Sequence, residues 1–141
     1  MIRNLFCIVT AGVWTVFCFP FATAILLFTL DPSASMLITR TWWSPVLMWA
    51  GGATLRVIGR ENLPDQGPLV FVSNHQSTID IPTLFVAIPI NCRFVAKKEL
   101  KYVPVLGWYL WLAKFPLIDR SRSRKAIQSL NDAAKLIKGG V

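Results

Sequence analysis

The sequence has a single histidine, His75, and only three cysteines, Cys7, Cys18 and Cys92. One histidine and cysteines at these positions do not reproduce the ligand spacing of a zinc site, so the sequence predicts free thiols and no metal. The G-x-S-x-G elbow that carries the nucleophilic serine of many hydrolases is also missing. A hydrolase using a serine with the histidine is therefore the weakest of the possible enzyme classes.

Charged residues are scarce, at 16% of the chain, while 54% of the residues are hydrophobic. The stretch Leu5–Leu30 contains no Asp, Glu, Lys, Arg or His. Since about 20 apolar residues in a helix cross the hydrocarbon core of a bilayer, this stretch predicts a transmembrane or membrane-embedded helix. A cleaved signal peptide, suggested by Arg3 and the A-x-A sequence at 22–24, and a buried core helix are the alternatives.

A second apolar stretch, Thr41–Leu55, follows a turn-rich break at 31–35. It contains Trp42, Trp43 and Trp49, and its length is marginal for a full crossing. Tryptophan is favoured in the headgroup layer, so the stretch predicts a re-entrant or interfacial helix, with an amphipathic helix packed on the domain as the alternative. We assign residues 1–54 to membrane-anchoring helices and residues 55–141 to a second domain.

Short apolar segments alternate with helical patterns after residue 54. Strands are expected at 55–58, 69–73, 92–96 and 115–118, and helices at about 78–88, 105–113 and 121–138, with a loop or short helix at 97–102. The segment 69–73 is almost entirely apolar, so we expect that strand to be buried on both faces. Strands that alternate with helices are typical of an α/β layered architecture.

The excess of positive charge lies in the last third of the chain. Acidic and basic residues balance in residues 1–90, and residues 91–141 carry the whole net charge of +8. This distribution predicts an anionic partner: nucleic acid, lipid headgroups or a phosphorylated substrate. The apolar N-terminal region favours lipid, so we expect membrane lipids and no nucleic acid; a solubilising basic face is the alternative for any single lysine.

His75 directly follows the 69–74 segment, and Asp80 lies five positions later. On a continuous helix these side chains would point about 140° apart, so they meet only if a turn separates them. A carboxylate beside an imidazole orients the ring as a general base, and imidazole titrates near neutrality. The alternative is that Asp80 only caps the next helix, because Ser77-x-x-Asp80 has the form of a capping box with Asp in place of Glu.

The segment around this pair belongs to a longer pattern. Residues 71–80 resemble the first signature of the glycerolipid acyltransferase family, and residues 94–100, 103–108 and 115–120 resemble its later segments in the same order. The resemblance runs from about Leu55 to Lys138. Ala113 and Lys114 stand where the second signature usually opens with glycine, and Pro116 interrupts it. The third signature, Glu-Gly-Thr-Arg, is absent, so we expect an incomplete acyltransferase domain.

The resemblance implies a partial α/β acyltransferase domain that acts in phospholipid biosynthesis. It would move a fatty acyl group from acyl-CoA or acyl-carrier protein to the free hydroxyl of lysophosphatidic acid, giving phosphatidic acid, with no bound cofactor. His75 would be the general base and Asp80 its orienting group. Arg120, helped by Lys97 and Lys98, would bind the acceptor's phosphate.

The same resemblance implies a membrane location with the catalytic part facing the cytoplasm, at the inner membrane if the source is bacterial. Two alternatives to the leading function stay open: a non-catalytic module that binds anionic membranes, and an acyltransferase that acts on another lysolipid.

Overall fold

The computed structural model describes residues 2–64, 69–119, 121 and 123–138. They fall into two compact units: unit 1, within residues 1–63 and 73–92, and unit 2, within residues 64–72 and 93–141. The predicted division of the chain at residue 54 stays a prediction.

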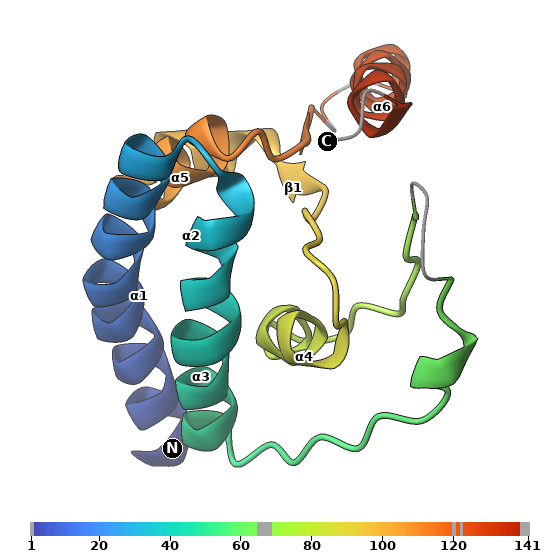
Figure 1. The fold of residues 1–141 in the computed structure, drawn as a ribbon. Helices are drawn as coiled ribbons and strands as arrows, with labels where there is room; N and C mark the ends of the chain where they lie inside the picture. Colours follow the sequence, from blue (N-terminus) through green and yellow to red (C-terminus); the bar gives the residue numbers. More distant parts are fainter. Residues whose placement is uncertain (1, 65–68, 120, 122, 139–141) are drawn as a thin grey trace. The chain divides into compact units, whose positions relative to one another are not determined.

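A helical hairpin dominates unit 1 (Figure 1). Its first arm is α1 (Ile2–Thr29), and its second arm is a continuous run of α2 (Pro32–Ile38), the π-helical segment Thr39–Trp43 and α3 (Ser44–Gly51). Side-chain hydrogen bonds fix an antiparallel register, because a residue near the start of α1 bonds the end of α3 while residues farther along α1 bond the π-helical segment: Cys7 Sγ to the Ala50 carbonyl at 3.0 Å, Trp14 Nε1 to the Trp42 carbonyl at 3.2 Å, and Trp43 Nε1 to Thr15 Oγ1 at 2.9 Å.

The turn of the hairpin explains where the second arm begins. Leu30 has a positive φ of 54°, and the carboxylate of Asp31 accepts a hydrogen bond from the Ser33 N–H at 2.8 Å. Pro32 fits the first helical position because no intrahelical partner exists there for an N–H. The predicted break at 31–35 was therefore wrong beyond Asp31, and the second apolar helix begins at Pro32 and not near Thr41.

The predicted apolar helix at 5–30 is confirmed as α1. Among the described residues, Arg3–Thr29 is the one helix long and apolar enough to cross a membrane, with a mean hydropathy of 2.0. Its large apolar side chains, including Ile8, Val13 and Phe28, are mostly exposed. A signal sequence near the N-terminus would share these properties, so the helix alone is a weak sign of membrane association.

Helix α4 (Asp80–Ala87) packs against α3 in unit 1. The Trp43 and Phe85 rings meet edge to face with centroids 6.3 Å apart. At the start of α4, Ile79 lies so close to Gly51 that a Cβ on Gly51 would come within 3.0 Å of Ile79 Cδ1. At the other end, Arg60, in the 3-10 helix Arg60–Asn62, donates to the Ala87 carbonyl at 3.1 Å. Both ends of α4 are thus held by other elements.

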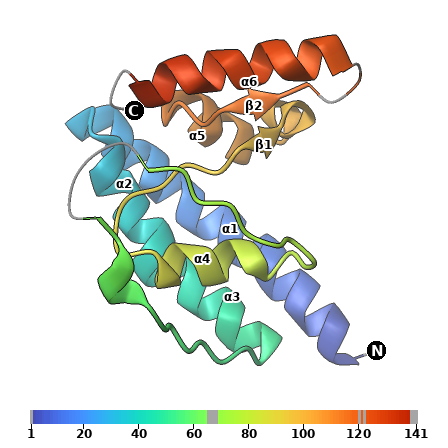
Figure 2. The ribbon, with the colours of Figure 1, turned by 90° about the vertical axis from the view of Figure 1, so that its right-hand side faces the viewer.

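Unit 2 contains a two-stranded parallel sheet. Strand β1 (Ala96–Lys97) pairs with β2 (Leu117–Ile118), so that Ala96 faces Leu117. The 3-10 helix η3 (Lys98–Tyr102) and α5 (Leu106–Leu112) connect the two strands, and α6 (Ser123–Lys138) lies alongside β2 (Figure 2). A Cβ on Gly107 would collide with the Lys101 carbonyl, which explains the glycine where α5 meets η3.

The α/β prediction is confirmed only in part, because the described chain is mostly helical with this one small sheet. The predicted helices at 78–88, 105–113 and 121–138 are confirmed as α4, α5 and α6, and the strands at 92–96 and 115–118 are reduced to two residues each. The strands predicted at 55–58 and 69–73 were wrong. Val70 and Val72, expected to be buried, are 70% and 93% exposed. A strand needs a hydrogen-bonded neighbour, and among the described residues no strand pairs with either segment.

Candidate active site

His75 and Asp80 meet at the start of α4. Nδ1 of His75 lies 3.0 Å from Oδ2 of Asp80. The predicted turn between them is present: the Asp80 N–H donates to the Ser77 carbonyl at 3.2 Å, which reverses the chain just before the helix begins. The contact between Ile79 and Gly51 anchors this turn on α3.

One carboxylate oxygen holds the turn together. Oδ2 of Asp80 accepts hydrogen bonds from the backbone N–H groups of Gln76, at 2.7 Å, and Ser77, at 2.8 Å, in addition to the contact with His75. These bonds lower the pKa of Asp80, the Ser77 and Gln76 N–H groups first and the imidazole after them. Asp80 is therefore ionised at neutral pH.

The bond from Ser77 N–H to Asp80 is the reciprocal half of the predicted capping box, while Ser77 Oγ faces the Ile79 N–H at 3.4 Å and α4 begins after Ile79. Asp80 holds the turn before α4 closed and contacts the imidazole at the same oxygen. Its negative charge also sits at the N-terminus of α4, where the helix dipole favours an anion.

The contact also determines which histidine nitrogen is available for chemistry. An ionised carboxylate can only accept, so Nδ1 of His75 carries the hydrogen in this contact, and in the neutral form of the ring Nε2 then presents a lone pair. The His75 side chain is 62% exposed and that of Asp80 is 27% exposed, which leaves the imidazole open to a substrate. A ring oriented in this way can take a proton from an alcohol.

The three residues predicted to bind phosphate belong to the second half of the chain. Lys97 Nζ lies 3.7 Å from a Glu99 carboxylate oxygen, with both side chains more than half exposed. Lys98 Nζ lies 3.1 Å from Oδ2 of Asp119. Arg120 lies outside the described residues.

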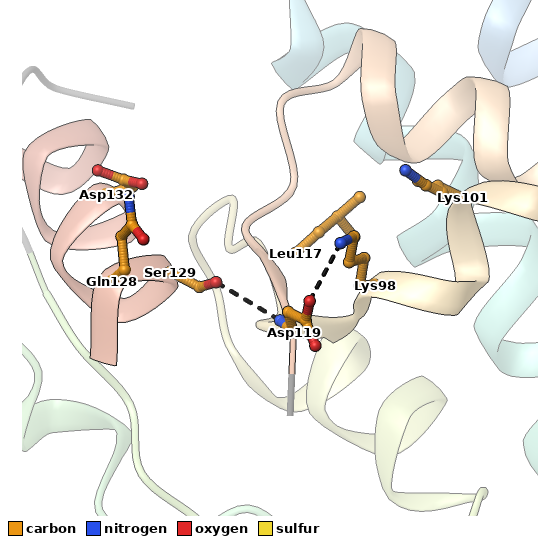
Figure 3. Close-up of a pocket in the computed structure, with 7 residues that line it drawn as sticks. All are labelled: Lys98, Lys101, Leu117, Asp119, Gln128, Ser129 and Asp132. Atoms are coloured by element: carbon orange, nitrogen blue, oxygen red, sulfur yellow. Dashed lines mark hydrogen bonds and ion pairs between the residues drawn. The ribbon is translucent and has the colours of Figure 1, made fainter. Parts of the chain in front are cut away.

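Lys98 and Asp119 line a cavity of about 400 Å³ in unit 2 (Figure 3). Lys101 and Leu117 also line it, and α6 contributes Gln128, Ser129 and Asp132. Figure 3 shows the Lys98 ammonium group directed at the Asp119 carboxylate, while the Asp119 N–H faces Ser129 Oγ at 3.5 Å.

Asp119 was missed by the sequence reasoning, although it directly precedes Arg120 in the second signature. Its side chain is 13% exposed, and Oδ1 accepts the Ser121 N–H at 3.0 Å. Hydrogen bonds from Ser121, then from Lys98, hold the pKa of Asp119 well below its usual range. The same pairing raises the pKa of Lys98, so this cation already has a carboxylate partner.

Comparison with known proteins identifies the protein family. Residues 54–140 match the family model described as Acyltransferase. The chain belongs to the acyltransferase family. The His75–Asp80 contact and the Lys98–Asp119 ion pair both lie within the matched range of this acyltransferase, and the helical hairpin precedes it.

Several curated relatives share this acyltransferase region. The chain is 42% identical over 87 residues to a 1-acyl-sn-glycerol-3-phosphate acyltransferase of Saccharomyces cerevisiae, covering 62% of this chain and 28% of the yeast protein. It is 35% identical over 86 residues to the alpha enzyme of the same name from Mus musculus, covering 61% of this chain and 30% of the relative. A relative of that name from Limnanthes douglasii is 35% identical over 92 residues, covering 65% and 32%.

The matched part of this acyltransferase thus spans less than a third of the length of these relatives. No solved structure matches the chain.

Proposed function

We propose that this chain forms part of a membrane-bound enzyme that acylates the free hydroxyl of 1-acyl-glycerol-3-phosphate to give phosphatidic acid, with acyl-CoA or acyl-carrier protein as the donor. The observation that carries the proposal is the 3.0 Å contact between His75 Nδ1 and Asp80 Oδ2, which supports a general-base role. The acceptor is taken from the names of the relatives, and no bound cofactor is required for this chemistry.

In the proposed reaction, Nε2 of His75 accepts the proton of the acceptor hydroxyl while that oxygen attacks the thioester carbonyl carbon of the donor. The new C–O bond forms, the C–S bond breaks, and the departing thiolate takes the proton from the imidazolium. Asp80 keeps the ring oriented and stabilises the imidazolium, as the carboxylate does in a catalytic triad. The nucleophile comes from the substrate, so no acyl-enzyme forms.

The acceptor's phosphate requires cations, and the second half of the chain has them in excess. We assign phosphate binding to Arg120, whose planar guanidinium matches phosphate oxygens, with help from Lys97. Lys98 is included in the same group, but its ion pair with Asp119 means that phosphate would compete with a carboxylate already 3.1 Å away.

The membrane location rests on α1, whose exposed apolar surface fits a bilayer. A lipid acceptor is concentrated in that bilayer, so an anchored enzyme meets its substrate at the membrane surface. In the proposed arrangement the catalytic part faces the cytoplasm, where acyl-CoA and acyl-carrier protein are found.

The test is the His75→Ala variant of the full-length protein, assayed with lysophosphatidic acid and acyl-CoA or acyl-carrier protein in vesicles. A general base is worth about 10²–10⁴ in rate, so kcat should fall by that factor. Thermal stability should change little because the side chain is mostly exposed. Asn131→Ala, at an exposed site on α6 outside the cavity lining, is a control that should keep wild-type activity.

Three results would contradict the proposal in different ways. Full activity of His75→Ala would remove the general-base role. Binding to anionic vesicles by a wild-type protein without any acyl transfer would point to a non-catalytic membrane module. Faster turnover of a lysolipid with another headgroup would replace lysophosphatidic acid as the acceptor.

A further inference from the structure

Unit 2 exposes large aromatic side chains along η3 and α5. Trp108 and Trp111 are 63% and 73% exposed, and Tyr102, at the end of η3, is 73% exposed. The two tryptophans are three positions apart in α5, which places them on the same side of the helix. Tyr109 and Leu110, on the other side of α5, are buried. The helix therefore has a packed side and an aromatic side that faces outward.

Lysines precede and follow these aromatic residues in the chain. Lys101 Nζ lies 4.7 Å from the centroid of the Tyr102 ring, and Lys114, which follows α5, is exposed. The segment from 101 to 114 contains no acidic residue. Tyr102, Trp108 and Trp111, together with Lys101 and Lys114, are called the tryptophan face below.

We propose that the tryptophan face enters the headgroup layer of an anionic bilayer, giving unit 2 a membrane contact of its own that does not depend on α1. An indole combines a large apolar ring with a polar N–H, and this combination is favoured at the boundary between headgroups and hydrocarbon. Exposed in water, two such rings leave a large apolar area unburied.

The positive charge of this region favours an anionic bilayer as the partner of the tryptophan face. Lysines beside an inserted aromatic ring are attracted to the phosphates of anionic lipids, and the region that contains the tryptophan face carries the whole net charge of the chain, +8. Unit 1 contains the helix that is apolar enough to cross a membrane, so a bilayer is available to the same molecule. The inference needs no catalytic activity and goes beyond the proposed function.

The test places a fluorescent probe on the face in the full-length protein. Cys7, Cys18 and Cys92 are replaced by alanine, and a single cysteine is introduced by Trp108→Cys or Trp111→Cys and labelled with an environment-sensitive dye. A third variant, Asn131→Cys on the exposed side of α6, is the matched control. Each protein is placed in vesicles of phosphatidylcholine and phosphatidylglycerol that contain spin-labelled lipid.

Lipid contact predicts that the dye at 108 and 111 shifts to shorter wavelength and is quenched by spin-labelled lipid, while the dye at 131 does neither. A blue shift without lipid quenching would show that protein covers the face, either another segment of the full-length chain or a second copy. Neither shift nor quenching would show that the face stays in water. Both results overturn the proposal, and circular dichroism of each variant verifies that it has folded.

A second measurement tests the role of charge. Combining Lys101→Gln and Lys114→Gln, or replacing phosphatidylglycerol with phosphatidylcholine, should reduce the quenching at 111 without changing the response of the control at 131. Equal quenching on neutral and anionic vesicles would overturn the selection of anionic lipid.

Discussion

Replacing Asp80 with asparagine separates the two tasks that its carboxylate performs. The side-chain oxygen of asparagine can still accept the N–H groups of Gln76 and Ser77, which now bind Oδ2 at 2.7 and 2.8 Å. These two bonds pin the oxygen in place, so we expect the turn before α4 to survive. The variant loses the negative charge that lies 3.0 Å from Nδ1 of His75.

The expected fall in kcat depends on the step of the reaction at which the negative charge of Asp80 is needed. In the proposed mechanism the imidazole gains a positive charge as it takes the hydroxyl proton, so the carboxylate would stabilise the transition state more than the ground state. The loss should therefore appear in kcat and leave KM nearly unchanged. Because the ring and its acceptor remain, we expect a fall in kcat of about 10²-fold, at the lower end of the range for general-base catalysis.

The assay measures kcat and KM of the full-length enzyme for lysophosphatidic acid in vesicles. Asp31→Asn is the matched control, because Asp31 also caps a helix, accepting the Ser33 N–H at 2.8 Å, but has no histidine beside it. That variant should keep the wild-type kcat. If Asp80→Asn also kept the wild-type kcat, Asp80 would be a helix cap only, and the base-and-orienter reasoning would be wrong.

Three further predictions concern the support of the site. Gly51→Ala should lower kcat, because its Cβ would lie 3.0 Å from Ile79 Cδ1 and push the turn; adding Ile79→Val, which removes that atom, should restore kcat. The pKa of Asp80 is lowered, so its stabilising effect is complete above about pH 4 and lost as the pH falls below it; the difference in melting temperature between wild type and Asp80→Asn should shrink in that acid range. Asp119→Asn should lower the melting temperature at neutral pH, because it leaves Lys98 without its anionic partner, and equal melting temperatures would contradict this.

Helices were predictable from the sequence because their signals are local. The 26-residue apolar stretch, the periodic apolar positions of 121–138 and the proline in the first turn of α4 each specify a helix without reference to the rest of the chain. The start at Pro32 was missed because Asp-Pro-Ser was interpreted as a turn, whereas the Asp31 carboxylate and Pro32 together begin a helix.

The strand predictions failed because strand formation depends on a partner segment elsewhere in the chain. The apolar run at 69–73 has the composition of a strand, but a strand forms only beside a partner, and composition does not specify one. The two strands that do form, β1 and β2, owe their pairing to the connection through η3 and α5, which brings Ala96 beside Leu117. The ion pair between Lys98 and Asp119 has the same origin, since each follows one of these strands directly, and it could not be predicted before the pairing was known.

The pair of His75 and Asp80 was predictable because the same bonds serve the fold and the site. The turn before α4 brings the Asp80 carboxylate back over the N–H groups of residues 76 and 77, and residue 75 adjoins them in the chain, so the turn itself delivers a histidine there to the carboxylate. The capping interpretation and the catalytic one are therefore not rivals in geometry. They differ only in whether the negative charge is needed, and that is why the decisive substitution is one that keeps the oxygen and removes the charge.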